Sequence, residues 1–462
     1  MYRKFGLLVL LGVAATLVSS ASAIIFVEET INVGTAPQAL LYDSIDQKVF
    51  VANHGSASVS VINPQTNTVI ATVPVDEYPS AMCWSPTSTK VYVVCAPPSG
   101  NGTVAVIDAY TNAVITSIGV DQSPAAIVWC SARNKAYCMN RTSATIAVID
   151  CQSDQVVEDI SLPNQTPNDI GYNTTNDHIY VSSSAYQQNG RVRAIDCATD
   201  QIVATITCAY GTADVEVNPV SNRVYAANTG GNTVTVINGA TNQRIGNITT
   251  RPAPTPLLWA TPNELFVGEY WDSTVAYLGG DELSIPTANR ISVGGNPKTL
   301  LFVPDCHQVF SALDLQGQIV ALDSRDGFVQ TYGILERLSV GSGPQAMAYF
   351  PGQNRVFVAN AWDSTVTVIR TEVGIEESGK PVRPSGPALV RALPSPAPAR
   401  HMVTFSATGF APTRLDIRDA GGRVVRSAVG QAARAWQAPA TGVYFCTLSN
   451  GVSSAACKLT VR

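Results

Sequence analysis

The chain repeats one pattern eight times, and this internal repeat limits its possible folds more than any other feature. Each copy holds a short β-branched or aromatic strand, a polar turn and a second strand that usually ends in V-I-D or V-I-N, as in VFVANHGSASVSVIN from Val49. Successive copies are 41 to 47 residues apart. One aromatic residue holds the same place in every copy: Phe50, Tyr92, Tyr137, Tyr180, Tyr225, Phe266, Phe310 and Phe357.

Two further strands complete each copy. A third strand such as residues 68–74 follows a polar turn, and a strand that begins with proline opens the next copy. Four short strands in about 43 residues are typical of a β-propeller blade, so we expect an all-β fold. In the fifth copy Thr212 replaces the proline and Val217 the large side chain five residues later. In the other copies we expect these large side chains to pack between blades: Tyr42, Trp84, Trp129, Tyr172, Trp259, Phe302 and Tyr349.

The two ends of the repeat region are predicted to share one blade. The last copy stops after its third strand near Arg370, and residues 25–33 form an unpartnered strand before the first copy. Pairing of these segments would close the ring and leave no open edge. The count predicts eight blades. Seven is the alternative if the irregular stretches 281–286 and 325–335 do not form full blades.

The repeats also point to a family. VFVANHGSASVSVINPQTNTVIATVPV and VYAANTGGNTVTVINGATNQRIGNI resemble the YVTN-type β-propeller repeats of bacterial and archaeal secreted and surface-layer proteins. The resemblance covers about residues 25–371, and we place the propeller at residues 24–371. It implies a fold rather than a function, because related propellers include binding scaffolds, lactonases, antibiotic lyases and subunits of quinone- or haem-dependent enzymes.

The first 23 residues are interpreted as a secretory signal peptide. They start with the basic Arg3 and Lys4, continue with an apolar stretch at residues 5–18, and end in a run of small residues at Ala23, where we expect cleavage. An N-terminal membrane anchor is the alternative, but the apolar stretch is shorter than the ~20 residues that span a bilayer. We therefore expect a secreted protein, extracellular or attached to the outer cell surface.

Beyond the repeats the composition changes. A proline-rich stretch at residues 372–400 is interpreted as a linker, and residues 401–462 carry a second β pattern. Six or seven short strands, with hairpin turns near Gly422 and Gly451, fit a small immunoglobulin-like sandwich.

This C-terminal region has a resemblance of its own. The segments LDIRDAGGRVVRS, PATGVYFCTLSNG and KLTVR resemble the C-terminal sorting domain of proteins exported by the type IX secretion system. The usual Asn-Pro and Tyr-Asp of that domain are Ser395-Pro396 and Arg418-Asp419 here. The resemblance implies recognition by outer-membrane secretion machinery. An immunoglobulin-like adhesion or spacer domain is the alternative.

Charge separates the two parts of the chain. Its 29 Lys and Arg against 34 Asp and Glu give a net charge of −5, which offers no case for nucleic-acid binding. From Arg391 onward nine basic and two acidic residues sum to +7, which leaves −12 for the rest. We interpret the basic residues as a solvated face, with attraction to an anionic surface as the alternative. We expect a monomer.

The ten cysteines divide in the same way. Eight are scattered through the repeats without a C-x-x-C pair, and we expect most of them to be buried thiols. Cys446 and Cys457 flank the turn at residues 450–451 and are predicted to form a cross-strand disulfide, which export would permit.

A search for chemistry finds few candidates. None of the four histidines has metal-ligand spacing, and no hydrolase or phosphate-binding motif occurs, so we predict no catalytic residue and no cofactor. Asp169 and Asp214 occupy equivalent places in adjacent copies and are candidate ligands of a divalent cation. A lactonase- or lyase-like propeller enzyme with such a site in its channel is the alternative function.

The favoured function is non-catalytic binding of a protein, a glycan or a surface component. On a symmetric scaffold, loops that differ between blades carry function. Aromatic side chains beside carboxylates suit recognition of peptide or sugar. The alternative is that each Trp packs over a neighbouring blade while Asp closes the turn. The candidate ligand-binding residues are Tyr78, Glu269, Tyr270, Trp271, Asp272, Trp362 and Asp363.

Overall fold

The computed structural model describes residues 23–260, 263–279, 282–286, 289–324 and 333–373, together with seven strands between residues 390 and 461. The chain divides into two compact units, Met1–Glu376 and Glu377–Arg462. Nearly all of the described chain forms β-strands and turns. Within the described residues, no helix is long and apolar enough to cross a membrane.

Eight antiparallel four-stranded sheets, the blades, build the first unit. Blade 1 consists of β2 (Pro37–Asp43), β3 (Lys48–Asn53), β4 (Ser58–Asn63) and β5 (Thr68–Pro74). Blade 2 consists of β6 (Pro79–Ser85), β7 (Lys90–Cys95), β8 (Asn101–Asp108) and β9 (Ala113–Gln122). Blade 3 consists of β10 (Pro124–Cys130), β11 (Lys135–Asn140), β12 (Thr145–Asp150) and β13 (Gln155–Ser161). Blade 4 consists of β14 (Thr166–Asn173), β15 (His178–Ser184), β16 (Asn189–Asp196) and β17 (Gln201–Tyr210).

The second half of the ring repeats this plan. Blade 5 consists of β18 (Thr212–Asn218), β19 (Arg223–Asn228), β20 (Thr233–Asn238) and β21 (Gln243–Thr249). Blade 6 consists of β22 (Pro254–Ala260), β23 (Glu264–Glu269), β24 (Thr274–Gly279) and β25 (Arg290–Ser292). Blade 7 consists of β26 (Pro297–Val303), β27 (Gln308–Leu313), β28 (Gln318–Asp323) and β29 (Ile334–Ser339). Blade 8 consists of β30 (Pro344–Phe350), β31 (Arg355–Asn360), β32 (Thr365–Val373) and β1 (Ala23–Asn32). Short 3-10 turns occur at His54–Ser56, Tyr270–Asp272 and Pro351–Gln353.

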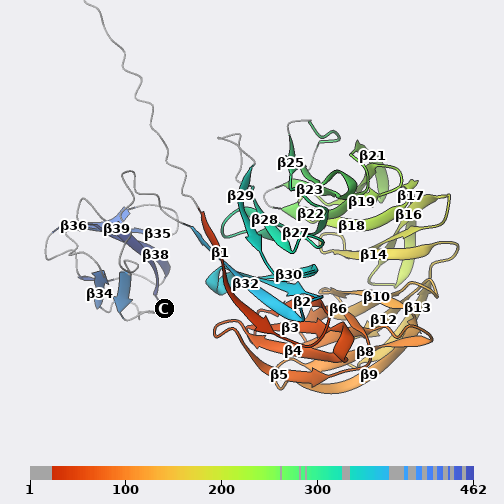
Figure 1. The fold of residues 1–462 in the computed structure, drawn as a ribbon, viewed down its shortest axis with the longest axis horizontal. Helices are drawn as coiled ribbons and strands as arrows, with labels where there is room; N and C mark the ends of the chain where they lie inside the picture. The colour runs from red at the N-terminus through yellow and green to blue at the C-terminus, as the bar shows by residue number, and fades with distance from the viewer. Residues whose placement is uncertain are drawn as a thin grey trace, which may run out of the picture. The chain divides into compact units, whose positions relative to one another are not determined.

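The blades form a closed ring (Figure 1). The first strand of each blade is innermost and contacts the first strand of the next blade, and β30 of the last blade contacts β2 of the first. This arrangement confirms an eight-bladed β-propeller and excludes the seven-bladed alternative, because the short β25 and the irregular seventh copy each complete a four-stranded sheet.

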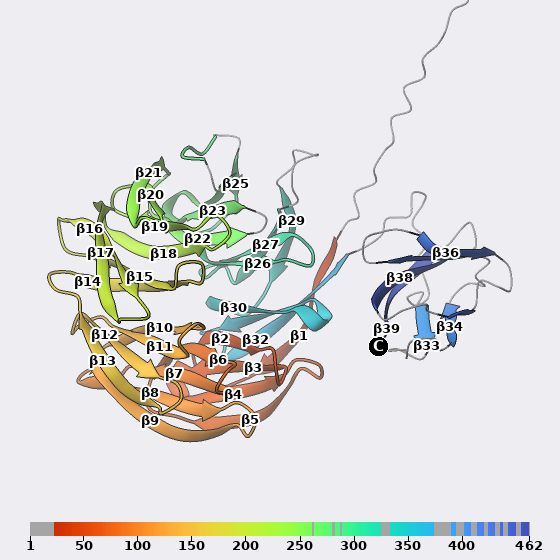
Figure 2. The same ribbon diagram turned by 180° about the vertical axis from the view of Figure 1, so that it is seen from behind.

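The last blade is assembled from both ends of the repeat region, as the sequence predicts (Figure 2). Strand β1 pairs antiparallel with β32, from Ala23 opposite Val373 to Asn32 opposite Thr365. The register shifts around Glu28, and the carboxylate of this residue accepts hydrogen bonds of 2.5 and 2.6 Å from the Arg355 guanidinium. The hydrogen bond from Arg355 lowers the pKa of Glu28.

Arg355 also connects blade 8 to blade 1. Its guanidinium donates to the backbone carbonyl of Pro64, at 2.6 Å, in the turn between β4 and β5. Lys90 and Lys135 hold the same place in their blades and reach the corresponding turn of the next blade, at Asp154 and Asp200. A basic residue at the start of the second strand therefore links neighbouring blades at several junctions, and at the closing junction it also binds the N-terminal strand.

The core lies between blades. The repeated aromatic residue on the second strand is fully buried in all eight blades. In three of the four blades where it is tyrosine, the hydroxyl donates to the next blade: Tyr92 to Asp154 at 2.8 Å, Tyr137 to Asp200 at 2.7 Å and Tyr180 to Asn242 at 2.6 Å. Six of the seven large side chains predicted on the innermost strands join these apolar clusters, which confirms that they pack between blades, as Trp84 and Trp129 do; Trp259 is the exception.

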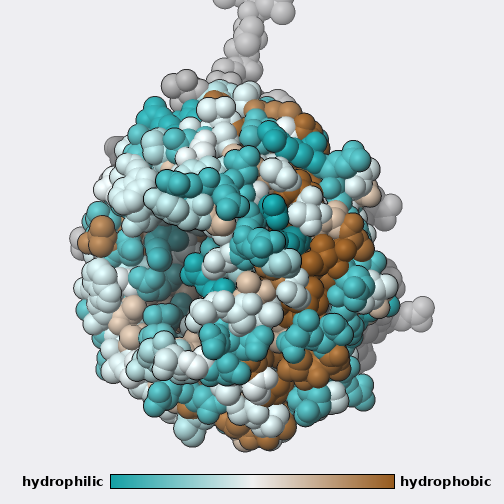
Figure 3. Space-filling view, turned by 90° about the vertical axis from the view of Figure 1, so that its right-hand side faces the viewer, coloured by the Kyte–Doolittle hydropathy of each residue, from teal (hydrophilic) through white to brown (hydrophobic). Residues whose placement is uncertain are grey.

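In every blade except blade 6 the outermost strand carries a β-bulge at one repeated position. In the first five blades an exposed Ile or Val occupies it. Figure 3, which views one side of the molecule, shows hydrophobic surface gathered in a band among hydrophilic side chains. A bulge interrupts the row of free backbone groups on an edge strand, which discourages pairing with another chain. The bulge residues are Ile70, Ile115, Val157, Val203 and Ile245.

The second unit contains two sheets. A three-stranded sheet joins β33 (Val390–Leu393), β34 (Met402–Ala407) and β37 (Ala435–Gln437). A four-stranded sheet has the order β36 (Val424–Val429), β35 (Arg414–Asp419), β38 (Gly442–Ser449) and β39 (Ser454–Val461). We expected residues 372–400 to be a linker. Within that range Val390–Leu393 form strand β33, whose backbone pairs with β34. The proposed signal peptide lies outside the described residues, apart from Ala23 at the start of β1.

The closure predicts a difference between two neighbouring glutamates. Glu28→Gln should lower the free energy of unfolding by about 1–3 kcal/mol at pH 7, because it removes the charge that pairs with a mostly buried Arg355. The control Glu29→Gln changes an exposed side chain on the same strand and should have little effect. Because the native pKa of Glu28 is lowered, the loss should shrink as the pH falls and Glu28 becomes protonated in the parent protein. Denaturant melts of both variants measure this; equal stabilities would contradict the proposed role of the ion pair.

The register of the second unit bears on the predicted disulfide. Cys446 of β38 and Cys457 of β39 are directly opposite one another. Opposed residues of antiparallel strands have Cα atoms about 4.5–5.5 Å apart, which lies within the range of disulfides. Peptide mapping of the exported protein without reduction should therefore recover these two cysteines as one linked peptide pair. Recovery of both as free thiols would refute the prediction.

Candidate functional site

One face of the propeller, called the upper face here, carries the turns between second and third strands and the connections into each next blade. In blades 1 to 3 and 5 to 8 a backbone hydrogen bond joins these two sets of loops. Examples are Ala96 N–H to the carbonyl of Tyr78 at 3.2 Å and Tyr270 N–H to the carbonyl of Ala253 at 3.0 Å. The loops are therefore held by the scaffold, and the side chains at the tips of the turns are free to differ between blades.

Apolar side chains occupy the tips of three successive turns on this face. Trp271, Leu315 and Trp362 hold the same position in blades 6, 7 and 8, and their side chains are 71%, 61% and 62% exposed. Tyr270 stacks edge-on against Trp271 with ring centres 5.1 Å apart. Trp362 lies against Gly343, where a Cβ atom would come within 2.8 Å of the indole ring. The two predicted tryptophans are thus displayed to solvent rather than covered by a neighbouring blade.

The carboxylates predicted beside them have structural partners. Glu269 is fully buried, accepts a hydrogen bond from the backbone N–H of Arg251 at 2.8 Å and forms an ion pair with Arg290 at 3.1 Å. Asp272 pairs with the Arg251 side chain at 2.5 Å. Asp363 accepts a hydrogen bond from the backbone N–H of Ser342 at 2.6 Å. These acidic side chains fasten the loops, so the exposed aromatic residues are the candidate ligand contacts that remain in this region.

Tyr78 lies elsewhere on the upper face, in the connection from blade 1 to blade 2. Its backbone has a φ of +60°, a left-handed conformation, and its ring is 5.1 Å from that of His54. The side chain is partly buried in this contact.

A groove across blades 3 to 5 escaped the sequence search. It has a volume of about 420 Å³, and an adjoining hollow of about 340 Å³ shares the ring of Tyr210. Tyr186 is 83% exposed and Tyr210 is 42% exposed. Arg141 and Asn168, joined by a 3.2 Å hydrogen bond, line the same groove. Tyr210 is the last residue of the outermost strand β17.

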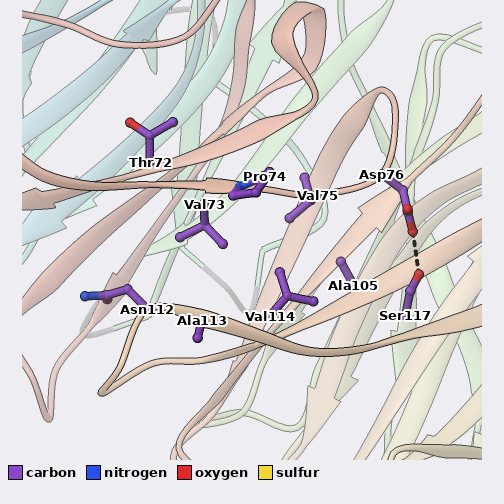
Figure 4. Close-up of a pocket in the computed structure, with 10 residues that line it drawn as sticks. All are labelled: Thr72, Val73, Pro74, Val75, Asp76, Ala105, Asn112, Ala113, Val114 and Ser117. Atoms are coloured by element: carbon purple, nitrogen blue, oxygen red, sulfur yellow. Dashed lines mark hydrogen bonds between the residues drawn. The ribbon is translucent and has the colours of Figure 1, made fainter.

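Another cleft lies between the outermost strands of blades 1 and 2 (Figure 4). Its volume is about 390 Å³, and β-branched and small side chains form most of its wall. Asp76 is its acidic residue, and its carboxylate accepts hydrogen bonds from Thr103, at 2.6 Å, and from Ser117. Because these hydroxyls bind the carboxylate, the cleft has little polar capacity for a ligand.

Three carboxyl groups lie on the innermost strands of blades 4 and 5. Asp169 accepts a hydrogen bond from the backbone N–H of Val215 at 3.0 Å, and Asp214 accepts one from that of Leu257 at 2.7 Å. Each therefore binds the innermost strand of the next blade. The two aspartates are also hydrogen-bonded to each other, and burial together with the Asp214 charge raises the pKa of Asp169. The divalent cation expected from the sequence at these two aspartates stays a prediction.

Glu216 continues this pattern. Its carboxyl accepts a hydrogen bond from the backbone N–H of Trp259 at 3.2 Å. Burial, reinforced by the Asp214 charge, raises its pKa from the ordinary 4.5 to about 8.

No family model matches the sequence, and none of the curated proteins searched matches it either. Solved structures share its fold. Kuenenia stuttgartiensis hydrazine synthase aligns over 73% of this chain and 96% of its own, with a TM-score of 0.52 and 20% identity. The computationally designed protein Ika8 aligns over the same shares, with a TM-score of 0.57 and 18% identity. A chain of the mitotic checkpoint complex covers 75% of this chain and 91% of its own, with a TM-score of 0.50 and 14% identity. At these identities the similarity concerns the propeller fold alone.

The raised pKa of Glu216 predicts a pH dependence of stability. The folded state holds a proton that the unfolded state releases above about pH 4.5, so stability is lost as the pH rises from about 4.5 to about 8. Glu216→Gln should flatten this loss and stabilise the protein at pH 9 by about 1–2 kcal/mol. Unfolding curves at pH 5 and pH 9 measure the difference, with Glu158→Gln on the exposed outermost strand as control. A variant with the same pH profile as the parent would contradict the assignment.

Proposed function

We propose that this protein is an exported, non-catalytic binding module that captures a glycan on the upper face of its propeller. The supporting observation is the distribution of exposed aromatic rings. Six aromatic side chains are exposed among the described residues, and four of them lie on this face: Tyr186, Tyr210, Trp271 and Trp362. Aromatic rings cover the apolar faces of sugars, while a few polar groups fix their orientation.

The groove of blades 3 to 5 is the proposed centre of binding. Tyr186 and Tyr210 offer rings, Arg141 offers hydrogen-bond donors and the Asn168 carbonyl oxygen offers an acceptor in the same groove. The Asn168 amide already donates to Ser184 and to the carbonyl of Thr212, both at 2.8 Å, so its orientation is fixed before a ligand arrives. Preorganised polar groups bind with a smaller entropic cost.

The enzymatic alternative has less support. A lactonase- or lyase-like reaction would need convergent polar groups near the ring axis. Asp169, Asp214 and Glu216 stand there, but each already accepts a backbone N–H from the next blade. Their contacts fit a role in holding the innermost strands together.

Export and surface delivery complete the proposal. The signal-peptide pattern of the first 23 residues and the YVTN-type repeats are typical of exported propellers. For the second unit we propose an immunoglobulin-like domain read by the type IX secretion machinery. Seven strands in two sheets and the local charge of +7 support this assignment.

Glycan-array binding by the full chain tests the proposal. Tyr186→Ala/Tyr210→Ala should weaken binding about tenfold or more, since loss of two aromatic contacts is worth at least ~1.4 kcal/mol. Trp271→Ala/Trp362→Ala reports whether the ligand extends over blades 6 to 8. Tyr110→Ala removes an exposed ring on the opposite face and serves as the control. Binding that survives the double tyrosine change, or binding of peptides instead of glycans, would overturn the proposal.

A further inference from the structure

Two cysteines and an aspartate meet at the junction of blades 3 and 4. Cys130 ends the innermost strand β10, Asp177 lies in the turn before β15, and Cys197 follows β16. One ligand atom from each lies within 4.8 Å of the other two. Both cysteines are fully buried and have free thiols. Among the described residues this is the one group of three or more His, Cys, Asp or Glu side chains that meets this distance.

The repeat shows that this cluster is not required by the scaffold. At other junctions the residue that ends the innermost strand forms an ordinary 2.7 Å hydrogen bond with the residue corresponding to Asp177. The pairs are Ser85 with Asn134, Asn173 with Asn222, and Asn218 with Asn263. The third position, that of Cys197, is Ala109 in blade 2 and Gly239 in blade 5. Of the junctions compared here, only the one between blades 3 and 4 has a potential metal ligand at all three positions.

The surrounding charges fit a bound dication. Arg133 donates to Oδ2 of Asp177 at 2.9 Å, which leaves Oδ1 facing Cys130 at 3.4 Å. The Tyr172 hydroxyl donates to the same Oδ1 at 3.1 Å. Two thiolates and one carboxylate around a dication sum to −1, and the Arg133 guanidinium brings the total to zero. Partners that orient a ligating carboxylate in this way are typical of metal sites.

We propose that Cys130, Asp177 and Cys197 bind a zinc-class divalent cation that fastens blade 3 to blade 4. Two sulfur ligands select a thiophilic metal over calcium or magnesium. Zinc favours four ligands, and the Tyr172 oxygen or a water molecule would supply the fourth. Binding releases the two thiol protons.

The repeat supplies substitutions that the fold already accepts. In the double variant Cys130→Ser/Cys197→Ala, each new residue is the one that stands at the equivalent position of blade 2, namely Ser85 and Ala109. In Asp177→Asn the new residue is the one at the equivalent position of blade 3, Asn134. Cys151→Ala is the matched control, because Cys151 holds the place of Cys197 one blade earlier, where Ser85 and Asn134 replace the other two ligands. Circular dichroism verifies that each variant is folded.

The experiment measures zinc retained by the reduced full chain after desalting, and the absorption of its cobalt form. The parent and the Cys151→Ala control should retain about one zinc per chain and show thiolate-to-cobalt charge-transfer bands. The double variant should lose both, and Asp177→Asn should weaken zinc affinity at least about tenfold. No zinc in the parent, equal zinc in the double variant, or a Cys130–Cys197 disulfide in protein isolated without reduction would each overturn the proposal.

Discussion

The pairing of β1 with β32 is the interaction on which the ring depends. A four-stranded blade has two apolar faces, and each face is covered only by a neighbouring blade. Blade 8 has just three strands from its own copy, so without β1 its outer part would be incomplete. At this point Arg355 of β31 pairs with Glu28 of β1 and donates a hydrogen bond to Pro64 in the turn after β4. It thereby joins three segments that are far apart in the sequence.

Much of the fold follows from the repeat because the same physical requirement recurs in every copy. The aromatic column from Phe50 to Phe357 indicated the buried second strand, and the unpaired strands at the two ends indicated how the ring closes; the structure confirms both. The strand β33 was hidden because proline-rich composition around Val390 is a stronger local signal than four residues of strand pattern.

The candidate site was less predictable because exposure and pairing depend on contacts between blades. Trp271 and Trp362 were found from the sequence, since a large aromatic residue at the tip of a polar turn stands out. The burial of Glu269 was not, because its partner Arg290 lies beyond the intervening strand and a loop. Likewise, loops of three blades line the groove at Tyr186 and Tyr210, and no local sequence pattern predicts that these loops lie close together.

The register of the closing pair has a mechanical consequence. Ala23 lies opposite Val373, so the chain enters and leaves the propeller at the same end of one antiparallel pair. A pulling force applied at these two points therefore breaks the hydrogen bonds between β1 and β32 one after another. It does not load all of them at the same time. The bulge at Glu28 sits partway along that path, where its carboxylate pairs with Arg370 of β32 at 3.6 Å and accepts hydrogen bonds from Arg355 of β31.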